Sequence, residues 1–274
     1  MPDYSEMLKK AREDTQCAME VWGEILPEIL GPRLESMYAK GSATKPWESH
    51  IDYVPTISDV DIHITLKDNK PLFGTYSEDF DRALEISEQC EEEFVRRRPD
   101  YFHVPRMQVI ETRLLRKIDK YTPPRPKDIL VLFGKPVLQK PPNRDVIREG
   151  DLERIVEDRE FIFDLPRRIF DRTGLDWWAI IRIMTWRVSP SPFRILTQYH
   201  FDPIDVWSWN RTKVHSALLE EGYEKLAEYY HGFYDAGWRL YQSQFKGLKE
   251  FREIAKHGYY VLYESFIQAQ RFSV

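Results

Sequence analysis

Acidic side chains are spaced along two predicted strands in a pattern that suits metal-dependent phosphoryl chemistry. Asp59 and Asp61 flank Val60 at the start of one strand, and Glu111 lies on a later one. Residues i and i+2 of a strand point to the same face, about 6–7 Å apart. A third carboxylate beside them would repel the pair unless cations such as Mg²⁺ or Mn²⁺ were bound. The spacing therefore predicts a metal site at Asp59, Asp61 and Glu111.

A glycine-serine turn precedes the aspartate pair. Gly41 and Ser42 follow a short predicted strand, and Lys45 comes three residues later. Glycine lets the backbone approach a phosphate closely, and backbone N–H groups together with the Ser42 hydroxyl can donate to its oxygens. Lys45 would add a positive charge. We expect Gly41, Ser42 and Lys45 to bind the phosphates of a nucleotide.

The order of these motifs resembles the DNA polymerase beta-type nucleotidyltransferase superfamily. The resemblance extends over roughly residues 36–136, and the helical second half is similar in outline to the branch with kanamycin nucleotidyltransferase and the minimal nucleotidyltransferases. The matching segments are Lys40-Gly41-Ser42, Asp59-Val60-Asp61-Ile62, Val109-Ile110-Glu111 and Leu132-Phe133-Gly134-Lys135-Pro136.

The resemblance implies an enzyme that moves a nucleoside monophosphate from a nucleoside triphosphate, expected to be ATP, to a hydroxyl or amine and releases pyrophosphate. Asp59 and Asp61 would bind both metal ions, and Glu111 would bind one ion and act as general base. A small-molecule acceptor such as an aminoglycoside is favoured, while a protein side chain or an RNA 3′ end stays open. A homodimer is also plausible by resemblance. The segment between Ser42 and Asp59 is longer than the family usually shows, which predicts an insertion within residues 47–57.

Two other functions remain open. A catalytically silent nucleotide-binding or antitoxin-like regulator would keep the fold and bind nucleotide without releasing pyrophosphate. A ribonuclease would use Arg252 and His257, whose spacing is similar to the Arg-x4-His element of the helical ribonucleases that partner minimal nucleotidyltransferases.

Hydrophobic periodicity predicts the elements that position these residues. Amphipathic helices are expected at 5–30 and 77–97, and strands at 34–39, 59–66, 107–115 and 129–133. Beyond a proline-rich stretch the chain is predicted to be helical, with helices at about 151–163, 177–188, 210–245 and 248–271. A break in the third of these near Gly232 or Gly237 stays open.

This order predicts an α+β fold with two domains. Residues 1–142 would form a nucleotidyltransferase domain, a small mixed sheet with flanking helices. Residues 143–274 would form a helical bundle that binds substrate, with the active cleft between the two. Arg187, Arg194 and Arg211 lie near tryptophans and helix breaks, which makes them candidate substrate-binding residues in the bundle.

Composition narrows the class of protein. The chain has 274 residues with 42% hydrophobic side chains, which excludes disorder as its main state. A net charge of −5 disfavours nucleic acid as a general partner. We expect no membrane segment, because no apolar stretch approaches the ~20 residues that a span requires. With no signal peptide at its start, the protein is expected in the cytoplasm, and Cys17 and Cys90 are expected to be small core residues.

Overall fold

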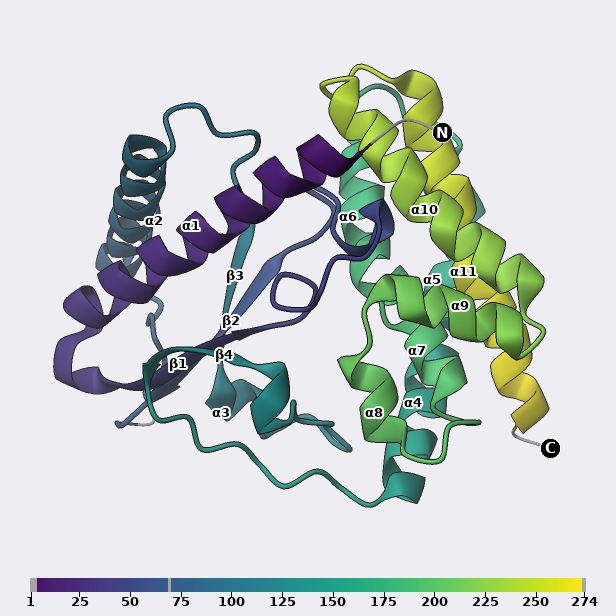
Figure 1. Ribbon diagram of the computed structural model, residues 1–274, viewed down its shortest axis with the longest axis horizontal. Helices are drawn as coiled ribbons and strands as arrows, with labels where there is room; N and C mark the ends of the chain where they lie inside the picture. Colours follow the sequence, from purple (N-terminus) through teal and green to yellow (C-terminus); the bar gives the residue numbers. More distant parts are fainter. Residues whose placement is uncertain (1–3, 69, 273–274) are drawn as a thin grey trace. The chain divides into compact units, whose positions relative to one another are not determined.

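The computed structural model describes residues 4–68 and 70–272 (Figure 1). The predicted α+β class, with a small mixed sheet and a helical C-terminal region, is confirmed. Contacts divide the chain into two compact units. The sheet unit comprises Met1–Lys45, Ser58–Asp119 and Pro123–Lys140, and the helical unit comprises Pro46–Ile57, Lys120–Thr122 and Pro141–Val274.

The sheet has four strands in the order β3-β2-β1-β4. Strand β1 pairs antiparallel with both β2 and β4, whereas β3 runs parallel to β2. The sheet is therefore mixed, and β1 and β2 are its two central strands. Their bounds are β1 Leu34–Lys40, β2 Val60–Leu66, β3 Met107–Glu111 and β4 Leu130–Gly134.

Two helices cover the apolar face of this sheet. Helix α1 (Ser5–Leu30) and helix α2 (Ser77–Arg97) lie side by side (Figure 1). Apolar residues recur on one side of each helix and pack with alternate residues of β1 and β2 in a single buried cluster. Cys17 and Cys90 belong to this cluster as free thiols, as predicted. The opposite face of β2 is left for polar side chains.

The predicted strand 107–115 is shorter in the structure. Strand β3 ends at Glu111, and Thr112–Leu115 form the short helix α3. The hydroxyl of Thr112 lies 3.0 Å from that of Thr65 on β2, which fixes the point where the chain leaves the sheet.

The helical unit begins earlier and breaks differently from the prediction. Its first helix begins at Arg144 rather than at about residue 151: Asn143 caps it by accepting a hydrogen bond from Val146 N–H, and Asp151 is buried inside that helix. The predicted helix 210–245 is two helices separated at Gly222, whose φ of +78° no helix can continue. The helices are α4 Arg144–Glu157, α5 Arg159–Ile169, α6 Asp176–Val188, α7 Ser191–Leu196, α8 Pro203–Ser208, α9 Arg211–Glu220, α10 Glu224–Gln242 and α11 Leu248–Phe272.

Residues 46–57, which include the predicted insertion, belong to the helical unit. In the sequence they lie between two segments of the sheet unit. Buried Asp52 accepts hydrogen bonds from the N–H groups of Glu48, Ser49 and Thr212 and from the Thr212 hydroxyl. Trp238 Nε1 donates to the carbonyl of His50 at 2.6 Å. The insertion is therefore an ordered part of the helical unit.

Candidate functional site

The strongest candidate site lies where β1 ends and β2 begins. Antiparallel pairing sets Lys40 opposite Asp61. Gly41 follows with a φ of +86°, and a Cβ atom at this position would lie 3.0 Å from Oδ2 of Asp61. A side chain here would thus meet both backbone strain and the Asp61 carboxylate. Glycine lets the turn pass close to the acid, so the structure brings Gly41 and Asp61 together.

Both aspartates have cationic neighbours. Lys40 Nζ lies 3.8 Å from Oδ2 of Asp61, and an Arg106 N–H group donates to Oδ2 of Asp59 at 2.6 Å. The side chains of Asp59 and Asp61 are 30% and 22% exposed. The site thus contains two partly accessible carboxylates beside two cations.

The electrostatic environment makes Asp61 unusually hard to ionise. Burial raises the pKa of Asp61 to about 6; the positive charge of Lys40 opposes this rise, the negative charge of Asp59 adds to it and Arg106 opposes it. A cation bound at this position would favour the ionised form of Asp61. The aspartate pair is therefore poised to accept a cation.

Glu111 does not join the aspartate pair. The register sets Asp61 beside Gln108 and sets Glu111 beside Ile64, three residues further along β2. Residues an odd number apart on a strand face opposite sides, so Glu111 lies on the other face from Asp61. Its carboxylate instead accepts two N–H groups from Arg113, at 2.6 and 3.1 Å. The predicted grouping of three acids is thus corrected: Val109-Ile110-Glu111 does form a strand, but its register is shifted by three residues.

Three residues near the pair were missed by the sequence analysis: Lys40, Arg106 and Gln108. Lys40 could have been inferred from the sequence, since antiparallel pairing of the two predicted strands would set it opposite Asp61. Arg106 and Gln108 had none, because the register between parallel strands joined by a long crossover is not encoded in local pattern.

The predicted phosphate-binding turn is held from behind by α1. The Arg12 guanidinium donates to the carbonyls of Ala43 and Lys45, each at 3.0 Å. The Thr44 hydroxyl and N–H both donate to the Gly41 carbonyl. These hydrogen bonds connect the turn to α1 and link its own residues. Gly41, Ser42 and Lys45 remain predictions as phosphate ligands.

His63 follows Asp61 on the same face of β2. Its ring is buried, and Nδ1 lies 2.9 Å from the Tyr38 hydroxyl of β1. Burial lowers the pKa of His63 to about 3, so the ring is neutral at physiological pH. His63 therefore places a neutral polar ring beside the site and adds no charge to it.

Asp59 and Asp61 provide two of the oxygen ligands that a magnesium ion takes. Within residues 4–68 and 70–272, no group of three or more His, Cys, Asp or Glu residues could hold a metal ion. Mg²⁺, however, commonly takes one or two protein carboxylates and completes its shell with water and substrate phosphates. Asp59 and Asp61 match that requirement, and Glu111 is not needed for it.

The three arginines predicted to bind substrate are engaged within the helical unit. Arg187 forms an ion pair with Asp158 at 2.8 Å, and Arg211 is buried and donates to the Ile51 carbonyl. The guanidinium of Arg194 lies in a largely buried environment near Asp151 and Asp158. All three therefore have positions in which they stabilise helix packing.

Arg252 and His257 both lie on α11, but five residues correspond to about 140° around a helix axis. Arg252 donates to the Leu248 carbonyl and lies over the Trp177 ring, whereas the His257 ring packs against Gly232. The two side chains therefore point in different directions, which does not favour a shared role in RNA cleavage.

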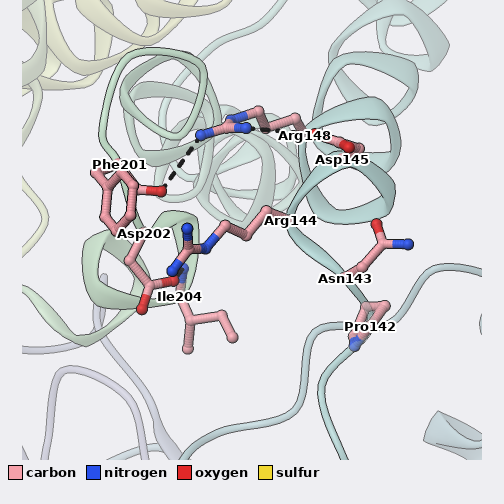
Figure 2. A pocket seen from close by; sticks show the side chains of 8 residues that line it. All are labelled: Pro142, Asn143, Arg144, Asp145, Arg148, Phe201, Asp202 and Ile204. Carbon is pink, nitrogen blue, oxygen red and sulfur yellow. Dashed lines mark hydrogen bonds and ion pairs between the residues drawn. The ribbon is translucent and has the colours of Figure 1, made fainter.

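A separate hollow of about 690 Å³ lies at the start of α4 (Figure 2). The Arg144 guanidinium lies 4.1 Å from the centre of the Phe201 ring, and Arg148 donates to three backbone carbonyls, those of Thr197, His200 and Phe201. Asp145 and Asp202 balance the two arginine charges in its lining. The pocket thus has no strong preference for ligands of one charge.

No protein-family model, curated protein or solved structure matches the chain. Across the part of the chain that the structure describes, no helix is both long and apolar enough to cross a membrane. Evidence on function therefore comes from the residues of the site.

Proposed function

We propose that the chain is a metal-dependent nucleotidyltransferase. The observation that carries this proposal is the close approach of the positive-φ Gly41 turn to Asp61, at the start of β2, which Asp59 immediately precedes. A turn of this kind suits close approach of a phosphate, and an adjacent pair of carboxylates suits the cation that accompanies it. The two parts of a metal–nucleotide site are thus adjacent.

The proposed reaction transfers a nucleoside monophosphate. An acceptor oxygen or nitrogen forms a bond to the α-phosphorus, the bond from that phosphorus to the bridging oxygen breaks, and pyrophosphate leaves with the bond electrons. The proton of the acceptor hydroxyl or amine passes to solvent water. Asp59 and Asp61 would hold the ion, whose charge would stabilise the phosphate oxygens. Gly41, Ser42 and Lys45 would hold the phosphates. Glu111, oriented away and held by Arg113, is given no part.

The acceptor is proposed to be a small molecule with a hydroxyl or amine, and the donor to be ATP. The overall charge of −5 gives no general attraction for a polynucleotide acceptor. A homodimer and a cytoplasmic location stay predictions.

A silent nucleotide-binding regulator is the second candidate, and one observation favours it. The neighbour of Asp61 on β3 is the amide Gln108 rather than an acid, and both aspartates already have cationic neighbours. Such a protein would bind nucleotide without transfer. The two candidates differ in two products, pyrophosphate and the modified acceptor, which only the enzyme would form.

The test is pyrophosphate release from each nucleoside triphosphate with Mg²⁺ or Mn²⁺ and a panel of amine and hydroxyl acceptors, with the modified acceptor identified by mass spectrometry. Wild-type protein should release pyrophosphate and yield an acceptor heavier by one nucleoside monophosphate. Asp61→Asn should lose both products. Nucleotide binding by the wild type without either product across the panel would favour the regulator.

A further inference from the structure

Arg106 lies at the position where a cation would bind Asp59. One of its terminal N–H groups donates to Asp59 Oδ2 at 2.6 Å, and its backbone carbonyl accepts from Val60 N–H at 2.9 Å, which ties the start of β3 to the start of β2. A divalent ion on Asp59 would repel this guanidinium. Arg106 and the ion therefore compete for the same carboxylate.

The contact of Arg106 with Asp59 is incomplete compared with that of Arg113, which lies just beyond the other end of β3. Arg113 uses two N–H groups to hold both oxygens of Glu111, the fork geometry that is strongest for arginine. Arg106 uses one N–H group, and its Nε is buried without a hydrogen-bond partner in the described part of the chain. Leaving Asp59 thus costs Arg106 less than leaving Glu111 would cost Arg113.

A displaced Arg106 would have a new anionic partner close by. Phosphate groups that share a cation with Asp59 must lie next to Asp59, and Arg106 is anchored there by its backbone. The planar guanidinium matches phosphate oxygens as well as it matches a carboxylate. Its unused N–H groups would then find acceptors.

We propose that Arg106 exchanges between two partners: it neutralises Asp59 when no ion is bound, and it binds the phosphates of the nucleotide when the ion occupies the aspartates. This inference rests on the proposed function and adds a phosphate-binding residue to it. It explains why a cationic side chain lies on an acid that is expected to bind metal.

The exchange predicts opposite effects on two binding constants. Arg106→Gln removes the competitor, so Mn²⁺ alone should bind about tenfold more tightly, while a non-transferable α,β-methylene analogue of ATP with Mg²⁺ should bind at least about tenfold more weakly. Mn²⁺ binding is measured by electron paramagnetic resonance and nucleotide binding by calorimetry. Arg113→Gln removes an ion-paired arginine beyond the other end of β3 and should change both constants less than twofold.

Several outcomes would overturn the exchange. Loss of both affinities in Arg106→Gln would show a structural role, and no change in either would show a surface ion pair. Arg106→Lys guards against misfolding, because it keeps the charge but not the fork and should bind nucleotide with intermediate affinity; wild-type affinity there would also contradict the exchange. Wild-type protein that binds neither Mn²⁺ nor nucleotide would overturn the proposed function itself, whereas normal wild-type binding with an unchanged Arg106→Gln would overturn the exchange alone.

Discussion

Two carboxyl groups, one in each unit, share a raised pKa but differ in exposure and in their hydrogen-bond partners. Burial raises the pKa of Asp61 to about 6 and that of Asp151 to about 6. Asp151 is 3% exposed, and its Oδ2 accepts hydrogen bonds from the Thr197 hydroxyl and Trp207 Nε1. Asp61 has an exposed edge, a second acid in Asp59 and a glycine turn against it.

The difference shows that a perturbed pKa does not by itself mark a functional site. Asp151 is almost fully buried, accepts two hydrogen bonds and lies near Arg194 and Arg154 of the same unit, so its environment serves packing. Asp61 keeps partial exposure beside a second acid, so its environment leaves room for a ligand. We therefore expect substitutions in the helical unit to change stability and substitutions near Asp61 to change chemistry.

The largest expected change in stability comes from Asp52 of the helical unit. Asp52→Ala would leave three partly buried backbone N–H groups without their acceptor, and we expect a loss of about 2–4 kcal/mol in the free energy of unfolding. Urea denaturation measures it. Asp52→Asn keeps one acceptor oxygen and should lose about half as much. A loss below 1 kcal/mol for Asp52→Ala would mean that the insertion is not anchored there.

Asp151→Asn should change how stability depends on pH. A carboxyl whose pKa is raised in the folded state binds its proton more tightly there, so its contribution to stability is greatest below the unfolded value of 3.8 and is lost as pH rises toward about 6. At roughly 1.4 kcal/mol per pKa unit, this loss approaches about 2–3 kcal/mol. The amide side chain in Asp151→Asn does not ionise, so this variant should not show the pH-dependent loss of stability.

Denaturant unfolding of the wild type and Asp151→Asn between pH 4 and 7 measures this effect as the change in their difference. As pH rises across that range, the free energy of unfolding of the wild type should fall relative to that of the variant. A difference that stays constant with pH would show that the Asp151 pKa is close to its ordinary value.

Gly41→Ala tests the turn beside Asp61. Its φ of +86° and the nearby Oδ2 should together reduce stability by about 1–2 kcal/mol, and nucleotide affinity should fall about tenfold because the turn must move. Gly222→Ala is a matched control, since Gly222 has a φ of +78° but no atom within 4 Å of the added Cβ. It should show a similar loss of stability with unchanged nucleotide affinity. Equal affinities in the two variants would contradict the proposed role of the turn.

Glu111→Gln should have the smallest effect. Glu111 lies on the opposite face of the sheet from Asp61, so we expect kcat/KM to fall less than about threefold, with a stability loss of at most about 1 kcal/mol from the weakened pair with Arg113. Steady-state pyrophosphate release measures it. A fall of a hundredfold or more would restore Glu111 as a third catalytic acid.

Sequence pattern predicted those parts of the fold that depend on local periodicity. Helix 77–97 and the alternation of Asp61 and His63 with buried Ile62 and Ile64 needed only the spacing of apolar residues. Pattern could not show that Glu111 pairs with Ile64 rather than with Asp61, because Val109 and Ile110 are consecutive apolar residues and either could face the core. The pattern also did not show that residues 46–57 pack with the helices, since Asp52 accepts a hydrogen bond from Thr212, which lies 160 positions away in the sequence.

The most direct test compares Asp61→Asn with Asp151→Asn for pyrophosphate release with Mg²⁺, ATP and a productive acceptor. Both substitutions remove one carboxylate whose pKa is raised to about 6. Asp61→Asn should reduce release at least about a thousandfold without unfolding the protein, whereas Asp151→Asn should keep it within about threefold. Equal activity in the two variants would contradict the assignment of the chemistry to the sheet unit.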